Sequence, residues 1–253
     1  MRFDVITLFP EVFSAITEQG ITARARKRGL WNIHFWNPRD VTEDAHRTVD
    51  DRPFGGGPGM VMMAEPLAKT LELIRAAGNR GRVIAFAPSA EHLTDERVRA
   101  LSASPDESLV LVCGRYEGID ERFLATHVDA FVSLGDFVLS GAELAACCLI
   151  DAVVRQLPGA IKELSQLDES FSTGLLDCPH YTRPEEWRGM RVPDVLLSGH
   201  HANIEKWRRE KSLEATFKNR PELLIISRSL GRLTKADEKF LALLACEKPA
   251  QGH

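Results

Sequence analysis

What this chain lacks excludes several classes of protein. It has no apolar run long enough to cross a membrane, so we expect no transmembrane segment, and its first residues predict a strand rather than a signal peptide. Its five cysteines include no Cys-x-x-Cys pair, and we expect reduced thiols in a cytoplasmic protein. No His-Glu-x-x-His motif or spaced Cys/His set indicates zinc, and we assign no residue as a metal ligand.

The glycine-rich stretch 54–60 lacks the patterns of two common nucleotide-binding loops. It carries no Lys-Ser/Thr pair, as a P-loop requires, and its spacing is not Gly-x-Gly-x-x-Gly. ATP hydrolysis and Rossmann-type dinucleotide binding therefore lack their sequence signatures. Asp50 and Asp51 precede the stretch. Paired carboxylates could hold Mg²⁺, but we favour a structural role in which they pair with Arg52 and cap a turn.

Charge is low overall and uneven along the chain. The net charge of −4 argues against a general polyanion binder. Residues 206–235 nevertheless contain nine Lys or Arg and three Glu, so this segment carries +6. Such a segment is either a footprint for a phosphate backbone or the solvated face of helices, and composition alone favours the solvated face.

The first 155 or so residues alternate short apolar runs with amphipathic stretches. The apolar runs predict strands at 2–8, 31–36, 83–87, 109–113 and 128–133. The amphipathic stretches predict helices at 10–17, 21–28, 65–77, 94–102, 119–126 and 141–156. This alternation predicts an α/β domain with a largely parallel sheet. Ser140 and Glu143 are spaced for a capping box at the start of the last helix.

The pattern changes after Pro158-Gly159, which should end that helix. Residues 161–175 are polar and irregular, which indicates a linker or mobile loop. Beyond them we predict short helices and no clear strand. The expected helices are 202–211, 212–218, 221–226 and 235–246. We therefore expect a small helical domain that carries the basic segment.

Two phrases carry the strongest functional signal. Residues 111–122 read Leu-Val-Cys-Gly-Arg-Tyr-Glu-Gly-Ile-Asp-Glu-Arg, and residues 133–141 read Ser-Leu-Gly-Asp-Phe-Val-Leu-Ser-Gly. Each runs from a strand through glycine toward a helix, and glycine lets the backbone approach a ligand closely. Both fall at the carboxyl ends of predicted strands, where parallel sheets bind ligands. A pocket built mostly from backbone suits a flat, polar, nucleoside-like ligand.

Further motifs occur in order along nearly the whole chain. They are 7–10 (Thr-Leu-Phe-Pro), 36–40 (Trp-Asn-Pro-Arg-Asp), 49–60, the two phrases, 174–184 and 197–201. Together they resemble the bacterial tRNA (guanine-N1)-methyltransferase family of the SPOUT superfamily. The resemblance implies an α/β fold with a deep C-terminal trefoil knot in a methyltransferase domain at 1–160. It also implies a flexible linker at 161–175 and a helical tRNA-binding domain at 176–253.

The resemblance also implies a cofactor, partners and site residues. S-adenosylmethionine should lie in the knot, and the family is Mg²⁺-dependent. It acts as a homodimer, with the active site at the subunit interface. The substrate is tRNA with guanosine at position 37, preferably after another guanosine, and the basic segment would hold its backbone. By position, the residues that should bind the cofactor are Pro88, Gly114, Tyr116, Gly118, Leu134, Gly135, Asp136, Phe137, Val138, Leu139 and Gly141.

The family's chemistry assigns catalytic roles to three residues. Guanine N1 is a poor nucleophile until a carboxylate removes its proton, and an arginine can stabilise the charge on O6. Arg155 matches the family's arginine. Glu169 stands where the family has an aspartate, and Asp168 precedes it. Either acid could be the base, and we favour Glu169 slightly because it keeps the register.

Two substitutions and two other hypotheses bear on activity. Ala142 stands where the family usually has glycine, and Ala145 replaces its usual proline, changes that could crowd or loosen the cofactor loop. One alternative is a tRNA-binding protein without catalysis, and the other is a knotted methyltransferase with a different RNA target. We also expect the linker to be disordered without ligands.

Overall fold

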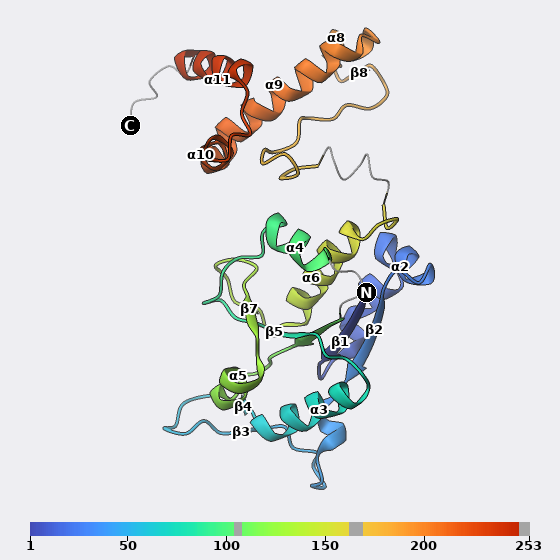
Figure 1. The fold of residues 1–253 in the computed structure, drawn as a ribbon, viewed down its shortest axis with the longest axis vertical. Helices are drawn as coiled ribbons and strands as arrows, with labels where there is room; N and C mark the ends of the chain where they lie inside the picture. The colour runs from blue at the N-terminus through green and yellow to red at the C-terminus, as the bar shows by residue number, and fades with distance from the viewer. Residues whose placement is uncertain (104–107, 162–168, 248–253) are drawn as a thin grey trace. The chain divides into compact units, whose positions relative to one another are not determined.

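The computed structural model describes residues 1–103, 108–161 and 169–247. The chain forms two compact units, Met1–Lys162 and Glu163–His253, which are described separately below (Figure 1). Residues 162–168 of the predicted linker, with the candidate base Asp168, lie outside the described residues, so the expectation of disorder there stays a prediction.

The first unit is built on a five-stranded sheet with the order β2-β1-β6-β5-β7. Its strands are β1 (Arg2–Ile6), β2 (Asn32–Trp36), β5 (Arg82–Phe86), β6 (Ser108–Val112) and β7 (Ala130–Val132). Every pairing is parallel, and β1 lies between β2 and β6, with Ile6 opposite both Trp36 and Val112. The predicted parallel α/β sheet is confirmed, and each predicted strand occurs within two residues at its start and its end.

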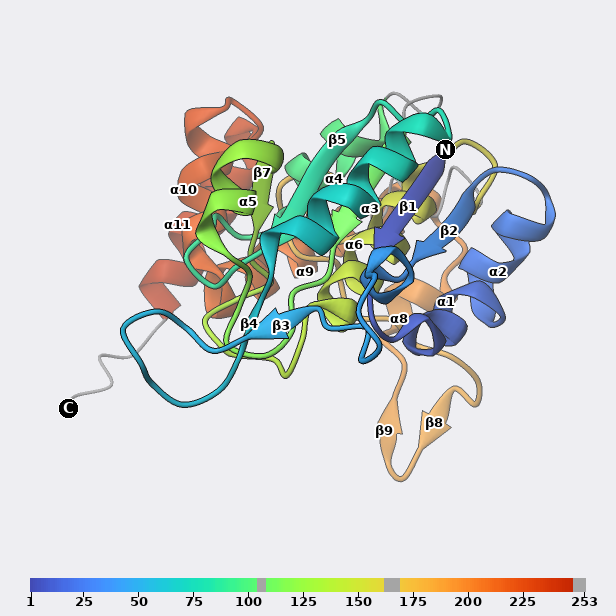
Figure 2. The ribbon, with the colours of Figure 1, turned by 90° about the horizontal axis from the view of Figure 1, so that it is seen from below.

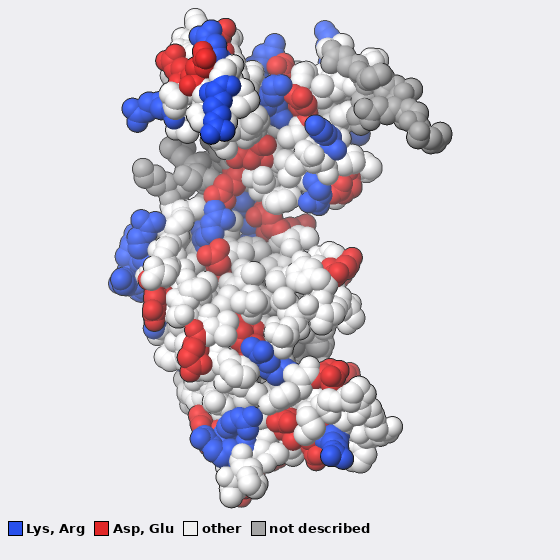
Figure 3. Space-filling view, turned by 180° about the vertical axis from the view of Figure 1, so that it is seen from behind, with Lys and Arg blue, Asp and Glu red and all other residues white. Residues whose placement is uncertain are grey.

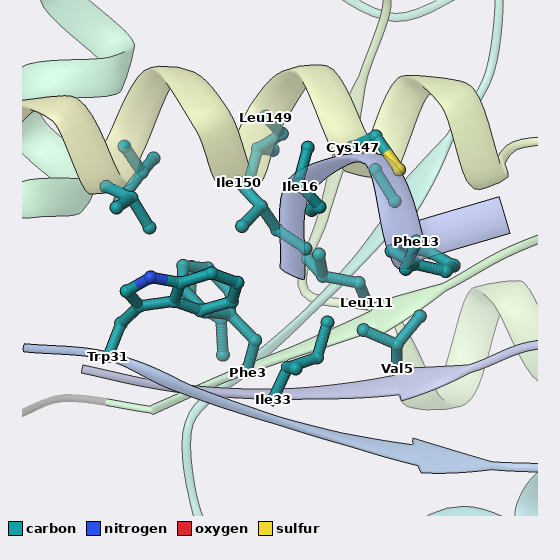
Figure 4. Packing of buried hydrophobic residues seen from close by; sticks show 14 of the residues in the cluster. Phe3, Val5, Phe13, Ile16, Trp31, Ile33, Leu111, Cys147, Leu149 and Ile150 are labelled. Atoms are coloured by element: carbon teal, nitrogen blue, oxygen red, sulfur yellow. The ribbon is translucent and has the colours of Figure 1, made fainter. Parts of the chain in front are cut away.

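Helices cover both faces of this sheet (Figure 1). They are η1 (Pro10–Phe13), α1 (Ser14–Thr17), α2 (Gly20–Lys27), η2 (Pro38–Val41), α3 (Ala64–Ala76), α4 (Asp95–Ser102), α5 (Glu121–His127) and α6 (Glu143–Gln156). Side chains alternate along β1, so Phe3 and Val5 pack toward α6, together with Leu149 and Ile150 (Figure 4). Ile6 instead packs against the cluster beneath α3. Each face of the sheet thus has its own buried cluster, and because all strands are parallel, the loops that follow them lie at one edge.

The predicted capping box at the start of α6 is wrong. The helix begins at Glu143, and Ala142 rather than Ser140 is the N-cap, with no capping bond from its side chain. The Glu143 carboxylate accepts a hydrogen bond from Thr7 Oγ1 at 2.9 Å and faces Arg115 Nε at 2.9 Å. The Glu143 carboxylate therefore contacts residues distant in the sequence instead of capping the helix, as the local sequence had predicted.

A small hairpin carries the glycine-rich stretch. Strands β3 (Asp50–Asp51) and β4 (Val61–Met62) are antiparallel, and the intervening loop extends from them (Figure 2). Asp51 Oδ1 accepts a hydrogen bond from the backbone amide of Arg52 at 2.7 Å, whereas no ion pair joins either aspartate to the Arg52 side chain among the described residues. The loop's other end bonds to the phrase after β6, where the Met62 amide donates to the Gly118 carbonyl at 2.9 Å.

The second unit is mainly helical and contains α8 (Asp194–Leu197), α9 (His201–Asn219), α10 (Pro221–Ser229) and α11 (Lys235–Glu247). Four leucines form its core, and the last of the supposed linker residues, Leu175, is one of them. The others are Leu213, Leu224 and Leu241. Residues 169–175 fold back in two turns, with the Gly174 amide donating to the Phe171 carbonyl at 2.9 Å.

Two predictions for this unit are wrong. The helices expected at 202–211 and 212–218 are one helix, α9, because the Ser212 hydroxyl donates to the Leu176 carbonyl instead of capping a new helix. The unit also contains a hairpin, β8 (Glu186–Trp187) and β9 (Met190–Arg191) (Figure 2). Its two-residue turn, Arg188-Gly189, has φ values of 53° and 79°, as a type I′ turn requires.

Candidate active site

A cavity of about 430 Å³ lies at the carboxyl edge of the first unit's sheet. It is formed by the ends of β5 and β7 and by the loops that follow β5, β6 and β7, which brings the two glycine phrases together. All of the predicted cofactor residues except Asp136 line it. They are Pro88, Gly114, Tyr116, Gly118, Leu134, Gly135, Phe137, Val138, Leu139 and Gly141. That the cofactor binds here stays a prediction.

Asp136 lies outside this lining. Its side chain is 92% exposed, and its Oδ1 lies 3.2 Å from His92 Nε2 on the loop after β5. The pairing connects the rim of the 133–141 loop with the loop that follows β5. A position inside a binding phrase therefore does not by itself place a side chain in the cavity.

The backbone conformations around the cavity fit a ligand held by main-chain groups. Gly118 has φ +143°, a region that favours glycine. Tyr116 has φ +59° without being glycine, and such strain gathers at functional sites. The Ala142 amide, directly after the second phrase, donates to the Gly114 carbonyl at 3.0 Å, and Arg115 Nη1 donates to the Ser140 carbonyl, so the two phrases are hydrogen-bonded to each other. The cavity wall is thus one connected piece of backbone.

Tyr116 joins the cavity to the N-terminal part of the unit. Its hydroxyl lies 3.3 Å from Arg39 Nη2. Partial burial raises the pKa of the Tyr116 phenol, the Asp50 carboxylate adds to the rise, and Arg39 opposes it. The phenol is therefore protonated at neutral pH and can donate a hydrogen bond. Asp50, considered above as a magnesium ligand, contacts this phenol instead.

Arg115 crosses the wall of the cavity behind the glycines. Its Nη1 donates to the Ser140 carbonyl at 3.2 Å, and its guanidinium lies 4.4 Å from the centre of the Phe9 ring. Glu143 behind it is buried and does not line the cavity. The sequence analysis missed this pair, although Arg115 lies inside the first phrase and Glu143 directly follows the second.

Other lining residues that the sequence analysis missed had a signal. Ala85 and Phe86 form the end of β5, the third strand end at this edge, and Ala87 directly follows it. The carboxyl end of a predicted strand in a parallel sheet was sufficient reason to include them. Ala142 and Ala145, the two departures from the family pattern, also line the cavity and are buried.

The candidate catalytic residues fall in different units. Arg155 lies half-buried in the last turn of α6, in the first unit, and does not line the cavity. Glu169 lines a second cavity of about 360 Å³ in the second unit, with Asp177, His180 and Arg208 among its neighbours. Asp177 Oδ2 lies 2.8 Å from His180 Nε2. This second cavity is polar and contains both acidic and basic groups.

The basic segment of the second unit is partly neutralised. Ion pairs join five of its nine basic residues to carboxylates on α9, α10 and α11, including Arg209 with Asp237 at 2.9 Å and Arg228 with Glu238 at 2.7 Å. Among the described residues, no ion pair joins Arg208, Lys218, Arg232 or Lys235. Figure 3 shows basic and acidic side chains interspersed on this unit. Its capacity for phosphate therefore rests on a few side chains.

Comparison with known proteins gives a consistent result. The family model of tRNA (Guanine-1)-methyltransferase TrmD matches residues 1–225. A tRNA (guanine-N(1)-)-methyltransferase of Cupriavidus metallidurans is 56% identical over 253 residues, covering 98% of this chain and 96% of the relative. One of Herminiimonas arsenicoxydans is 57% identical over 250 residues, covering 96% of this chain and 100% of the relative.

Among the described residues, no helix is long and apolar enough to cross a membrane.

Proposed function

The chain belongs to the tRNA (guanine-N1)-methyltransferase family, and from this premise we propose that it methylates N1 of guanosine at tRNA position 37. Family membership makes the protein a methyltransferase, with S-adenosylmethionine as the implied methyl donor. The finer statements about nucleotide, residues and assembly are proposals. The observation that carries them is the cavity enclosed by the two hydrogen-bonded glycine phrases.

The cavity suits S-adenosylmethionine in size and chemistry. Its volume of about 430 Å³ lies in the range that small-molecule sites occupy. Backbone amides and carbonyls of the phrases can bond the adenine edge, because glycine leaves them accessible. The exposed Phe137 and Leu139 provide apolar cover. We propose that these loops form the trefoil knot of the family and hold the donor with its methyl group directed outward.

The proposed reaction needs a base and a stabiliser of negative charge. The N1–H proton passes to the carboxylate of Glu169 or Asp168, the N1 electron pair forms a bond to the methyl carbon, and the carbon–sulfur bond breaks. S-adenosylhomocysteine and 1-methylguanosine result, so charge and atoms balance. Arg155 would stabilise the negative charge that develops on O6.

The second unit supports the assignment of tRNA as substrate. Arg208 lines its cavity beside Glu169, and an arginine there can contact phosphate or stack on an extruded base. We propose a homodimer in which the helical unit of one chain meets the knot of its partner. This arrangement would bring a carboxylate of the helical unit to the partner's donor site, and Arg155, which does not line the cavity of its own chain, would act at the site of the partner.

The side chains of the described residues offer no evident site for Mg²⁺. Among the described residues, no group of three or more His, Cys, Asp and Glu gathers as a metal site, so the side chains there do not by themselves fit the ion. We therefore derive no step through Mg²⁺. A requirement for it stays a prediction, tested by methylation with EDTA and with added MgCl₂.

The experiment that tests the function is methyl transfer from labelled S-adenosylmethionine to an unmodified G36-G37 tRNA transcript. The wild type is compared with Glu169→Gln, Asp168→Asn and Arg155→Gln, with Glu210→Gln as the matched control. Glu210 pairs only loosely with Lys206, at 3.8 Å on α9, and should be dispensable. Loss with Glu169→Gln alone supports the favoured base, and loss with Asp168→Asn alone shifts the register by one residue.

Nuclease digestion of the labelled tRNA identifies the product. Label in 1-methylguanosine at position 37 is expected. Label in another nucleotide would contradict the substrate assignment. A wild-type protein that binds donor and tRNA without transferring label would instead be the tRNA-binding protein without catalysis.

A further inference from the structure

The ion pair between Arg115 and Glu143 joins the two glycine phrases from behind. Arg115 Nε lies 2.9 Å from Glu143 Oε2, a charge contact without hydrogen-bond geometry, and the two side chains are 21% and 1% exposed. Arg115 belongs to the phrase after β6, and Glu143 is the first residue of α6, directly after the other phrase. The pair therefore spans the two segments that enclose the cavity.

The contacts of the pair extend to a third strand end. Thr7, directly after β1, donates through its hydroxyl to Glu143 Oε1 at 2.9 Å, and the Phe9 amide donates to that hydroxyl at 3.0 Å. The Phe9 ring lies against the Arg115 guanidinium. One buried carboxylate thus fixes the relative positions of the loops after β1, β6 and β7.

The cavity wall is shaped around the Arg115 side chain. A Cβ built at Gly141 would lie 2.3 Å from Arg115 Nε, so glycine is required where the arginine passes. Arg115 also donates to the carbonyl of the preceding residue, Ser140. Shifting the guanidinium would therefore move backbone that lines the cavity.

A buried ion pair is an unusual choice if stability alone matters. Removing a carboxylate and a guanidinium from water costs several kcal/mol, and apolar replacements of similar volume are often as stable or more stable. Separating the two groups would leave the buried Glu143 carboxylate without its charged partner, which is costly. Here the position at the N-terminus of α6 also favours the carboxylate through the helix dipole.

We propose that Arg115 and Glu143 are positioning residues that set the spacing of the two glycine phrases for the methyl donor. The proposal deepens the proposed function and rests on it, since the ligand is taken to be S-adenosylmethionine. Glu143 acts through Arg115 and the backbone of the phrases, without touching the donor.

The test begins with Glu143→Gln, which keeps shape and the Thr7 bond but removes the charge. A double variant, Arg115→Met with Glu143→Leu, replaces the pair by apolar groups. Calorimetric titration with S-adenosylmethionine and thermal unfolding are measured on each full-length protein. We expect donor affinity to fall about tenfold or more in both, which corresponds to a loss of about 1.4 kcal/mol of binding free energy. The melting temperature should be lower in Glu143→Gln than in the wild type. The double variant should have the wild-type melting temperature again, but its affinity for the donor should stay low.

The matched control is Asp4→Asn, which breaks a second buried ion pair in the same unit. Asp4 Oδ2 lies 2.6 Å from Arg2 Nε, and Asp4 lines no part of the cavity. This variant should lose stability while donor affinity stays at the wild-type value. Wild-type affinity in Glu143→Gln, or recovery of affinity together with stability in the double variant, would overturn the positioning role.

Hydrogen exchange of residues 133–141 in the ligand-free proteins separates this proposal from the proposed function. Exchange there should accelerate in Glu143→Gln and in the double variant, but not in Asp4→Asn. If the wild type does not bind the donor, the cofactor assignment fails. The exchange rates then decide by themselves whether Arg115 and Glu143 position the 133–141 phrase. Unchanged exchange would then overturn the positioning role, and faster exchange would support it.

Discussion

Gly141→Ala should weaken binding of the methyl donor because the added methyl group has no room. Its Cβ would lie 2.3 Å from Nε, 2.5 Å from Cδ and 2.6 Å from Cζ of Arg115. The guanidinium cannot move aside freely because Glu143 and the Ser140 carbonyl hold it. Overpacking of this kind costs about 1–3 kcal/mol. If the cost falls on the bound state, donor affinity drops by about 5- to 150-fold.

A double-mutant cycle tests the cause as well as the size of the effect. Arg115→Ala removes all three atoms that the new methyl group would meet, so Gly141→Ala should cost little in that background. Dissociation constants from calorimetric titration of the four proteins give the coupling. Urea unfolding of each confirms that the proteins compared are folded.

Gly118→Ala is the matched control for this cycle. Gly118 has φ +143° and nothing within 4 Å of a built Cβ, so alanine there is strained without a clash. Its effect on donor affinity should be the same with and without Arg115. An equal loss for Gly141→Ala in both backgrounds, or no loss in either, would refute the reasoning.

Three further predictions concern stability and reactivity. Burial raises the pKa of Asp237, but the opposing interactions, of which the hydrogen bonds from Arg209 are the largest, together lower it more, so the pKa in the folded protein lies below its ordinary value. The ionised Asp237 therefore stabilises the folded protein at a pH above the pKa that the group has in the unfolded chain. This stabilisation is lost as the pH falls through the pKa of the folded protein. Urea unfolding should show Asp237→Ala to be less stable by about 3 kcal/mol at pH 7, a difference that shrinks in acid. Ser140→Ala should change the free energy of unfolding by less than about 0.5 kcal/mol, since Ser140 does not cap α6, and a larger loss would restore the capping box. Iodoacetamide should modify the exposed Cys246 in the native protein but not the buried Cys113, whose thiol pKa is raised by burial, and mass spectrometry of peptides would reveal the contrary.

The parts of the fold that the sequence predicted well depend on local signals. Apolar runs bounded by turns predicted every strand of the main sheet. The signal is strongest for the inner strands β1, β5 and β6, which are largely buried on both faces. Strand ends next to glycine predicted where the phrases would meet. Periodicity contains no information about sheet order, so the placement of β1 between β2 and β6 was not predicted.

The errors arose where distant partners outweighed local preferences. Ser140 and Glu143 have the spacing of a capping box, but Arg115 and Thr7 bind the carboxylate. Ser212 has the character of a helix start, yet its hydroxyl bonds to the Leu176 carbonyl and α9 continues. In both cases the competing partner is at least 28 residues away in the sequence.

The order of strands in the main sheet also governs when the cavity at its carboxyl edge can form during synthesis. β2 can pair with β1 early, because Arg2 and its partner Asn32 are close in sequence. The other neighbour of β1 is β6, in which Ser108 pairs with Arg2, and β6 is synthesised much later. Until the ribosome has released residue 112, one edge of β1 is open, and open strand edges promote association between nascent chains. β7 and the 133–141 phrase emerge later still. The cavity is therefore among the last features of the first unit to form, and chains truncated before α6 should lack a donor site.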